Sequence, residues 1–342
     1  MKEAMLYSKE ADNRVACRLC RHSCRIADGE AGICKVRVNE GGTLYSIFYG
    51  QPVTMSVDPI EKKPLFHFLP GTAAYSIATM GCNFQCPFCQ NWQISQYRGD
   101  SSEVASGPKV TPDQIVAEAK ATKCRSISYT YTEPTVFFEY AYDIAKLAKE
   151  QGLHNNFVTN GYMTREAIDT IHPYLDAANI DLKSFRKDTY RKQMKGQLDG
   201  VLDSIKYMKE RGIWIEVTTL LVTGMNDSEE EIRDIAKFIV ETGRDIPWHV
   251  SAFFPTYNYT DEPSTNLEIL DRAYEIGKEA GLHFVYLGNV RGSTKESTAC
   301  YNCDKLLIVR NGYHVRDNFI TQSSKCPECG VFIDGVGMGK TV

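Results

Sequence analysis

Apolar runs alternate with amphipathic stretches between about residue 75 and residue 290 of the chain. The runs are rich in β-branched and aromatic residues and lie at 75–80, 126–131, 155–160, 177–183, 214–222, 248–254 and 283–288. Nearly continuous apolar strands separated by helical patterns are typical of a parallel sheet that is covered by helices. Six or seven such units favour a full or partial β/α barrel, and we expect the partial (β/α)6 type. A lone dinucleotide-binding sheet is disfavoured because no GxGxxG fingerprint follows the first run.

Two of the predicted helices carry clear amino-terminal signals. Thr111-Pro112-Asp113-Gln114 supplies an N-cap, a proline at the first helical position and a capping-box partner. Ser228 and Glu231 form a second capping-box pair, and the helix that follows them ends near Gly243. Its apolar face is formed by Ile232, Ile235, Ala236, Ile239 and Val240. In a barrel the chemistry lies at the carboxyl ends of the strands, so polar residues there are the candidate site residues.

Composition excludes several classes of function. The 342 residues are 43% hydrophobic and 24% charged, as in an ordinary globular protein, and no apolar run approaches the ~18 residues of a membrane span. The charged amino-terminus has no signal-peptide core, so we expect a cytoplasmic protein without a membrane partner. A net charge of −4 argues against nucleic acid as a partner, although residues 14–37 are locally basic. In a reducing compartment, twelve cysteines indicate metal or redox chemistry rather than disulfides.

The cysteines divide the chain into three expected domains. We expect a cysteine-rich metal-binding segment over residues 1–70, the barrel over 71–295 and a zinc-ribbon-like domain over 296–342. A hinge-like segment at residues 58–72 precedes the first barrel strand, and Cys124 stands alone.

The stretch GCNFQCPFCQN, residues 81–91, places Cys82, Cys86 and Cys89 directly after the first barrel strand. Three thiolates do not close a tetrahedral zinc site by themselves. They suffice to hold three irons of a four-iron cluster and to leave the fourth iron open for an exogenous ligand. A zinc site that is completed by a distant histidine or cysteine is the simpler alternative.

This CxxxCxxC spacing, with the aromatic Phe88 before the last cysteine, resembles the signature of radical S-adenosylmethionine (radical SAM) enzymes. The resemblance implies a 4Fe-4S cluster on Cys82, Cys86 and Cys89, whose open iron chelates the methionine part of S-adenosylmethionine (SAM). It also implies that one electron, from a donor such as flavodoxin or ferredoxin, cleaves a carbon–sulfur bond of SAM. The cleavage normally gives a 5′-deoxyadenosyl radical that abstracts hydrogen, so the three cysteines would be the catalytic and cofactor-binding centre.

The end of the second strand extends the resemblance. Thr132, Glu133 and Pro134 stand in the place of the Gly-Gly-Glu-Pro element of radical SAM activases, whose backbone receives the amino group of SAM. Here Tyr131 and Thr132 replace the two glycines, which are the residues that allow the closest backbone approach. A helix amino-terminus without a further role is the alternative.

The next two strand ends add further candidates. Thr159 and Asn160 end the third strand, and Asp181-Leu182-Lys183 ends the fourth. The latter resembles the Asp-Leu-Lys element of pyruvate formate-lyase activating enzyme-like proteins, which implies that Lys183 pairs with the SAM carboxylate and Asp181 accepts from its amine. A plain alternation of charges at a strand end is the alternative.

Two further cysteine groups flank the barrel. The knuckles Cys300-x-x-Cys303 and Cys326-x-x-Cys329 are typical of a zinc ribbon, and LLIVRNGYHV between them predicts two strands joined by an Asn-Gly turn. Four thiolates close a site, so we expect a structural zinc there, with an auxiliary iron–sulfur cluster as the alternative. The amino-terminal set has a less typical spacing that allows zinc or a second cluster, and we favour a structural metal over an electron relay. It consists of Cys17, Cys20, Cys24 and Cys34, with His22 as a candidate substitute ligand.

The whole chain, from the amino-terminal cysteines to the ribbon, resembles the radical SAM enzymes of the AmmeMemoRadiSam system, relatives of pyruvate formate-lyase activating enzymes. Our leading hypothesis is a SAM-cleaving radical enzyme that acts on a protein or small molecule, with activation of a glycyl-radical partner as one form. The alternatives are an RNA-modifying radical SAM enzyme that uses the basic amino-terminal segment, and a metal-stabilised SAM-binding scaffold with little turnover.

Overall fold

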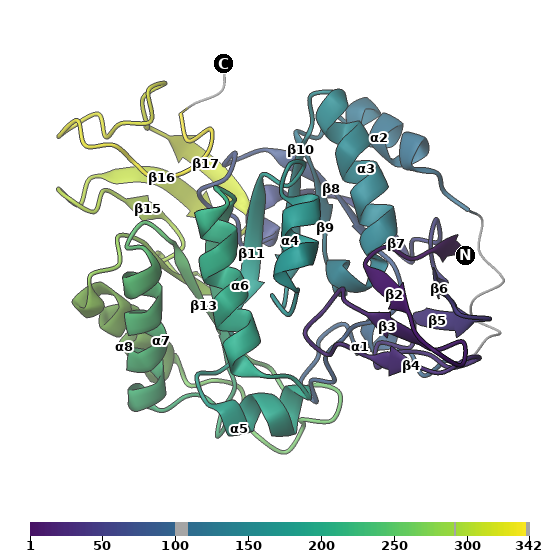
Figure 1. The fold of residues 1–342 in the computed structure, drawn as a ribbon. Helices are drawn as coiled ribbons and strands as arrows, with labels where there is room; N and C mark the ends of the chain where they lie inside the picture. Colours follow the sequence, from purple (N-terminus) through teal and green to yellow (C-terminus); the bar gives the residue numbers. More distant parts are fainter. Residues whose placement is uncertain (100–108, 291, 340–342) are drawn as a thin grey trace. The chain divides into compact units, whose positions relative to one another are not determined.

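The computed structural model describes residues 1–99, 109–290 and 292–339 (Figure 1). The chain divides into two compact units, each assembled from separated stretches. The first unit consists of Met1–Asp58, Ala73–Ala178 and Tyr190–Ile213, and the second of Pro59–Thr72, Asn179–Thr189 and Trp214–Val342. The expected domain boundaries at residues 70 and 295 stay a prediction.

The first unit combines two small amino-terminal sheets with parallel strands and helices. The sheets have the orders β1-β6-β5 and β2-β3-β4, and β8, β9 and β10 are parallel neighbours. Helices α2 and α3 pack on each other and against β9 (Figure 1). The strands are β1 (Lys2–Glu3), β2 (Tyr7–Lys9), β3 (Val15–Cys17), β4 (Arg25–Ile26), β5 (Arg37–Glu40), β6 (Thr43–Ser46), β7 (Thr54–Pro59), β8 (Ala73–Ala78), β9 (Ser126–Tyr129) and β10 (His154–Thr159). The helices are α1 (Trp92–Ser95), α2 (Pro112–Ala121), η3 (Pro134–Phe137), α3 (Phe138–Glu150), α4 (Arg165–Ile171), η4 (Tyr190–Met194) and α6 (Leu198–Glu210).

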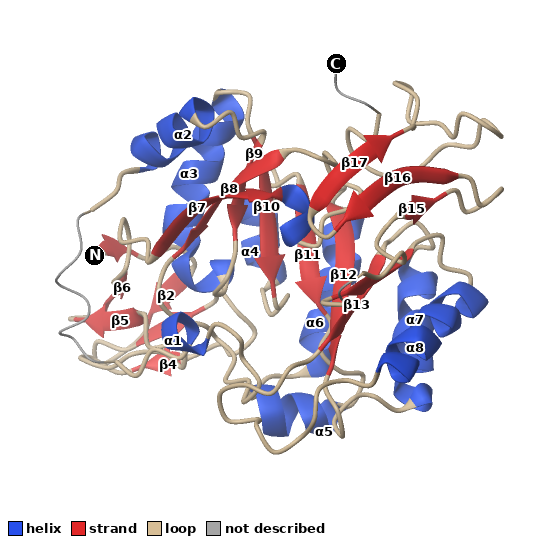
Figure 2. Cartoon of the chain, turned by 180° about the vertical axis from the view of Figure 1, so that it is seen from behind, coloured by secondary structure: helices blue, strands red, loops and turns tan. Residues whose placement is uncertain are grey.

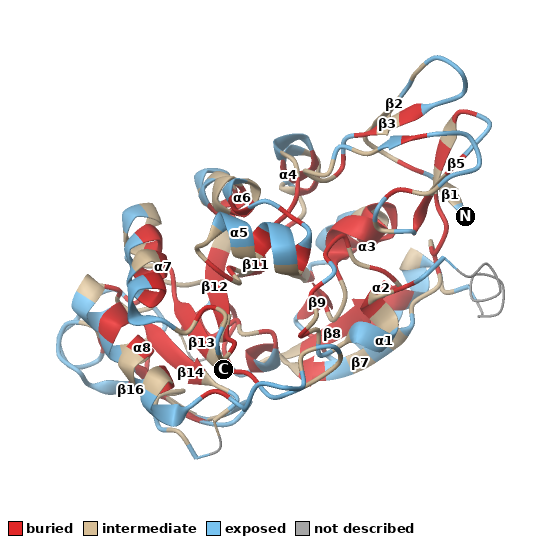
Figure 3. Cartoon of the chain, turned by 90° about the horizontal axis from the view of Figure 1, so that it is seen from below, coloured by how far each residue is buried: buried red, intermediate tan, exposed pale blue. Residues whose placement is uncertain are grey.

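Strand β11 (Ala177–Asp181) runs from the first unit into the second. In the second unit β12, β13 and β14 are parallel, and α8 packs against β13 and β14 beside α7 (Figure 2). Along α7 and α8 buried residues recur every three to four positions, so each helix has a buried face and an exposed face (Figure 3). The unit contains η1 (Ile60–Lys62), α5 (Lys187–Thr189), β12 (Trp214–Leu221), α7 (Glu229–Thr242), β13 (Trp248–Ala252), α8 (Leu267–Ala280), β14 (Val285–Gly288), β15 (Thr298–Ala299), β16 (Leu306–Asn311) and β17 (His314–Asn318).

All seven predicted barrel strands are present, from β8 to β14. The capping box at the start of α2 is also confirmed, because Thr111 and Gln114 exchange bonds of 2.8 and 3.3 Å. The second box is only half formed. Ser228 accepts from the Glu231 N–H, but the Glu231 carboxylate accepts from Ser184 Oγ at 2.5 Å instead of from the cap backbone. The Glu231 carboxylate therefore bonds to a residue distant in sequence, Ser184, instead of the backbone N–H of the N-cap residue.

The segment that we expected to be hinge-like is buried in the second unit. His67 is fully buried, its N–H donates to Glu216 Oε1 at 2.7 Å, and its Nδ1 lies 2.6 Å from the Asp334 carbonyl oxygen. Arg310 Nη2 donates to the Phe66 carbonyl oxygen at 2.8 Å. Because its backbone and side chains are bonded on several sides, this segment is a structural element rather than a free connector.

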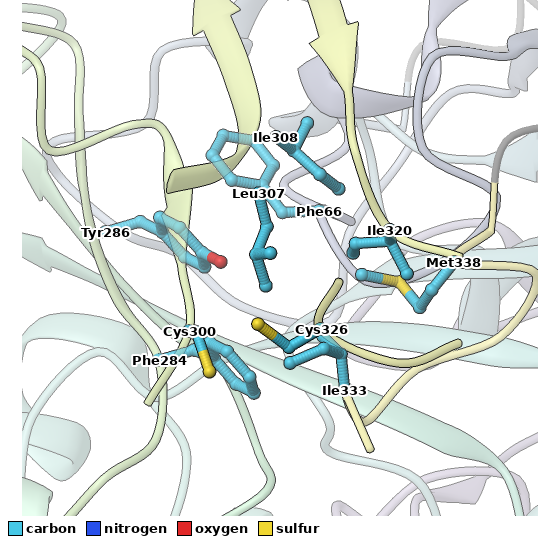
Figure 4. Close-up of a cluster of buried hydrophobic side chains, with 10 residues drawn as sticks. All are labelled: Phe66, Phe284, Tyr286, Cys300, Leu307, Ile308, Ile320, Cys326, Ile333 and Met338. Carbon is cyan, nitrogen blue, oxygen red and sulfur yellow. The ribbon is translucent and has the colours of Figure 1, made fainter. Parts of the chain in front are cut away.

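The carboxyl-terminal strands form the antiparallel ribbon that the sequence predicts, with the order β15-β16-β17 and Gly312 in the turn. Its cysteines lie beside an apolar cluster (Figure 4). The cluster consists of Phe66, Phe284, Tyr286, Cys300, Leu307, Ile308, Ile320, Cys326, Ile333 and Met338. The ribbon therefore shares a core with other parts of the second unit. Among the described residues, no helix is long and apolar enough to cross a membrane.

Candidate active site

The cysteine loop after β8 is held against neighbouring backbone at both ends. Gly81 has a φ of +104°, a region that favours glycine, and a Cβ at this position would lie 2.6 Å from a methyl group of Val36. The Gly81 N–H donates to the Ile94 carbonyl oxygen at 2.8 Å. Further along, the Gln85 N–H donates to the Met194 carbonyl oxygen at 3.1 Å. Steric contact and backbone bonds thus fix the loop before any metal is considered.

The three thiols of this loop are buried or partly buried, and Phe88 is 3% exposed. The Phe84 N–H donates to Cys82 Sγ at 3.3 Å. Burial raises the pKa of Cys82 well above its ordinary value, and the charges of Glu133 and the neighbouring thiolates raise it further. Such a thiol gives up its proton when a metal ion binds the sulfur.

Among the described residues, Cys82, Cys86 and Cys89 do not form a compact group of metal ligands like that of the ribbon cysteines. Sulfurs that share one tetrahedral zinc lie about 3.8 Å apart, given Zn–S bonds of about 2.3 Å. In a cluster each thiolate binds its own iron, so the sulfurs stand further apart.

Glu133 connects the ends of β9 and β10. It is 1% exposed, and its Oε1 accepts from Thr159 Oγ1 at 2.7 Å and from Thr135 Oγ1 at 2.5 Å. Its Oε2 accepts from the Asn160 N–H at 2.8 Å. Burial raises the pKa of this carboxyl, while these neutral donors partly restore the ionised form. Glu133 also caps the short helix η3 by accepting from the Thr135 N–H, so the structural alternative weighed from the sequence holds alongside any binding role.

Two asparagines, Asn160 and Asn83, connect Glu133 to the cysteine loop. Asn160 Nδ2 donates to Asn83 Oδ1 at 2.7 Å and lies 3.8 Å from Cys82 Sγ. Asn83 is 1% exposed, and its Nδ2 has no hydrogen-bond partner among the described residues. An unsatisfied buried amide donor costs about 1–3 kcal/mol. Together with the thiol donor set, this orphan donor beside Cys82 shows that the site suits a group that offers acceptors.

Tyr131 has a backbone conformation that favours glycine. Its φ is +65°, in the left-handed region that non-glycine residues rarely adopt. Its hydroxyl donates to Asp58, and its carbonyl oxygen accepts from Asn91 Nδ2 at 2.9 Å. Thr132 Oγ1 donates to the Thr79 carbonyl oxygen at 2.9 Å, which ties the same turn to the end of β8. Tertiary bonds therefore hold the turn in the conformation that glycine would allow.

Asp181 and Lys183 lie in the second unit and pair with each other. Lys183 Nζ lies 2.7 Å from Asp181 Oδ2, and the Lys183 carbonyl oxygen accepts from Asn226 Nδ2 at 2.7 Å. Both side chains are partly exposed, so they can exchange this contact for a ligand at low cost.

The ribbon cysteines form a compact four-sulfur group. One sulfur atom from each of Cys300, Cys303, Cys326 and Cys329 lies within 4.8 Å of all the others. The Cys300–Cys329 and Cys303–Cys326 sulfur separations are 3.6 and 3.7 Å. These values match the ~3.8 Å expected around one tetrahedral ion.

The amino-terminal cysteines line a cavity of the first unit together with His22. His22 also contacts the cysteine loop, because its Nε2 lies 2.7 Å from the Asn83 carbonyl oxygen. Burial lowers the pKa of its ring. The histidine that we considered as a substitute ligand therefore connects the amino-terminal segment to the cysteine loop.

Sequence reasoning missed several residues that position the candidate site. Asn83 and Asn91 lie inside the cysteine stretch, yet neither was singled out. Ser95 was also missed, although its Oγ lies 3.1 Å from Cys89 Sγ. The asparagines beside the cysteines were the only available indication, because their partners lie far away in the sequence.

Comparisons with known proteins agree with this geometry. The signature of the Radical SAM superfamily matches residues 76–239. Uncharacterized protein MJ0808 of Methanocaldococcus jannaschii is 44% identical over 336 residues, which are 98% of this chain and 99% of that protein. The pyruvate formate-lyase-activating enzyme of Clostridium pasteurianum is 27% identical over 180 residues, or 49% of this chain and 72% of that one. Streptococcus suis SuiB bound to S-adenosylmethionine has a similar fold, with a TM-score of 0.51 at 16% identity, over 68% of this chain and 53% of that chain.

The chain belongs to the radical SAM superfamily. It is therefore an enzyme, and membership implies a 4Fe-4S cluster, SAM and a source of electrons. The α/β fold with parallel strands and a carboxyl-terminal cysteine group, expected from the sequence, is confirmed.

Proposed function

We propose that Cys82, Cys86 and Cys89 ligate three irons of the 4Fe-4S cluster and that the protein cleaves SAM reductively to start radical chemistry. The observation that carries this proposal is the chain of contacts from Glu133 through Asn160 to Cys82. It joins two strand ends to the cysteine loop, where a ligand on the open iron would lie. When bound, cluster and SAM together supply the one-electron cleavage of a carbon–sulfur bond.

Glu133 favours a positively charged ligand. The hydrogen-bond donors described above are all neutral, so its negative charge is not balanced by them. A cationic group that approaches would lower the pKa of this carboxyl and be stabilised by it. The ammonium and the sulfonium of SAM both meet this requirement. Thr159 and the Asn160 N–H fix the carboxylate, so it needs little reorganisation when the ligand arrives.

Further residues complete the proposed SAM site. Thr132 belongs to the turn whose backbone would receive the amino group, and Phe88 keeps water from the base of the loop because it is buried. Asp181 and Lys183 of the second unit stay predicted SAM contacts, Lys183 for the carboxylate and Asp181 for the amine.

The relatives suggest the substrate class. One of them is a pyruvate formate-lyase-activating enzyme, which supports an activase-like reaction on a protein partner. For the electron donor we propose flavodoxin or ferredoxin. In that reaction the substrate loses a hydrogen atom and becomes the radical. A small-molecule hydrogen donor is the other form of the same proposal.

We also propose that the ribbon binds zinc in a structural role. The support is the sulfur separation of 3.6–3.7 Å, which suits one ion with four thiolates. Two of the four cysteines, Cys300 and Cys326, are buried within the apolar cluster in Figure 4, as suits a structural site.

The test is SAM cleavage by the anaerobically reconstituted full chain. We expect 5′-deoxyadenosine, or another SAM fragment, to form only when dithionite is present. Cys86→Ala should abolish this product while circular dichroism stays unchanged. Cys124→Ser is the matched control, because this buried thiol belongs to none of the three cysteine groups.

Two outcomes would contradict the proposal. A cluster-loaded protein that binds SAM but never cleaves it, with any reductant, is a scaffold rather than a radical enzyme. RNA that is retained in a salt-dependent way and lost on neutralising Arg18, Arg21 and Arg25 would favour RNA modification over a protein substrate. The second result would leave SAM cleavage in place and replace only the substrate class.

A further inference from the structure

Four cysteines near the amino-terminus surround one space. Cys17 ends β3, Cys20 and Cys24 lie between β3 and β4, and Cys34 lies between β4 and β5. All four line one cavity of the first unit.

The amino-terminal cysteines are arranged differently from those of the ribbon. Among the described residues, only the ribbon cysteines form a compact group of metal ligands, with sulfur separations of 3.6 and 3.7 Å. The amino-terminal cysteines instead line the wall of a cavity. Thiolates around a cavity suit a cluster, in which each ligand binds its own iron.

A second, independent observation comes from Arg37, which lines the same cavity and is 2% exposed. Its Nη1 pairs with Glu139 at 2.8 Å, and its Nη2 donates to the Met5 carbonyl oxygen at 2.6 Å. Its Nε is buried and has no hydrogen-bond partner in the described part of the chain. A buried guanidinium N–H without a partner is unfavourable, so it indicates an acceptor inside the cavity. Cluster-bound sulfur is such an acceptor, and these hydrogen bonds tune a cluster.

We propose that Cys17, Cys20, Cys24 and Cys34 bind a second iron–sulfur cluster, with the Arg37 Nε–H as a donor to its sulfur. The proposal selects a cluster over the single zinc ion that the cysteine spacing alone allowed. It does not rest on SAM cleavage, because it concerns a separate set of ligands.

The cavity lies directly beside the loop that carries Cys82. His22, which lines the cavity, bonds to the Asn83 carbonyl oxygen at 2.7 Å. Gly81 lies close enough to Val36 and to the Cys34 carbonyl oxygen that a Cβ would be 2.6 and 3.5 Å from them. His22 therefore connects the cavity that would hold the second cluster to the backbone of the first cysteine loop.

The experiment removes the loop cluster and asks whether iron remains. The full chain carrying Cys82→Ala, Cys86→Ala and Cys89→Ala together is reconstituted anaerobically with iron and sulfide and analysed for both elements. We expect it to retain about four iron and about four sulfide per chain, with the absorbance and reduced-state spectrum of a 4Fe-4S cluster. Adding Cys20→Ser and Cys24→Ser should remove this iron, whereas adding Cys124→Ser should not.

Two results would overturn the proposal. One is a folded triple variant that holds about two zinc ions per chain and neither iron nor labile sulfide. The other needs no substitution: the unaltered chain should contain about eight iron and about one zinc, so about four iron and two zinc contradict the second cluster. Arg37→Lys, which keeps the charge beside Glu139 but removes Nε, should lower the reduction potential of the residual cluster. An unchanged potential would refute the assigned role of Arg37.

Discussion

Gly81 offers a quantitative test of how the cysteine loop packs on the amino-terminal segment. In Gly81→Ala, the new Cβ meets two penalties: a φ of +104°, and a distance of 2.6 Å to Val36 Cγ1. Holding a residue with a side chain in this backbone region costs about 1–2 kcal/mol. Forcing a methyl group into a filled space costs a further 1–3 kcal/mol or so. We therefore expect the free energy of unfolding to fall by about 2–5 kcal/mol.

A matched glycine and a double variant separate the two penalties. Gly212 has a φ of +79°, and a Cβ added there would have nothing within 4 Å, so Gly212→Ala should cost only the backbone part, about 1–2 kcal/mol. Val36→Ala removes the clashing methyl group at a cost of about 2 kcal/mol by itself. In the double variant Gly81→Ala with Val36→Ala, the costs should be less than additive by about 1–2 kcal/mol.

Urea unfolding followed by circular dichroism measures these differences, and iron retention after reconstitution reports on the adjacent loop. The reasoning is refuted if Gly81→Ala is no more destabilising than Gly212→Ala. It is equally refuted if the costs of Gly81→Ala and Val36→Ala simply add, because the steric contact would then have no measurable weight.

Three further substitutions test other parts of the chain. Cys303→Ser should remove about one zinc per chain by elemental analysis and lower the melting temperature, and unchanged zinc would exclude the ribbon site. Tyr131→Phe loses the hydroxyl bond to Asp58 and should cost about 1–2 kcal/mol in urea unfolding; an unaltered midpoint would show that the backbone needs no such anchor. Arg165, with Arg21, lowers the pKa of Asp203 to about 2. The contribution of ionised Asp203 to the free energy of unfolding is therefore complete above pH ~4 and is lost as pH falls toward 2. The difference in the free energy of unfolding between the unaltered protein and Asp203→Asn should therefore be constant from pH 7 to 5 and decrease below pH 4. An increase of this difference on acidification would contradict the assignment.

The elements were predictable where local chemistry decides them. The seven barrel strands are buried on both faces, so their apolar runs are visible in the sequence. Thr111 and Gln114 cap α2 as expected because both partners lie within one turn. Glu231 departs from the same rule because Ser184, 47 residues away in the chain, competes for its carboxylate. The burial of residues 59–72 was equally hidden, since it depends on contacts with strands and loops far along the chain.

The candidate site shows the same division. The cysteines and Glu133 were evident from their spacing and motif. The left-handed backbone of Tyr131 was not, because bonds from Asn91 and to Asp58 maintain it. The arrangement of the cysteines was also not predictable. Both flanking groups contain four cysteines, and only the structure shows that the ribbon sulfurs are compact and that the amino-terminal cysteines line a cavity.

The buried segment before β8 ties the beginning of the chain to its end, which constrains how the protein is made. Phe66 and His67 leave the ribosome early, yet they bond to Arg310 and Asp334, which are synthesised 244 and 267 residues later. Until those residues emerge, the segment exposes apolar side chains and unpaired backbone, and the second unit cannot finish folding. Contacts of such long range also slow folding. A nascent or truncated chain without the ribbon is thus a natural client for chaperones, even when every residue of the cysteine loop is already present.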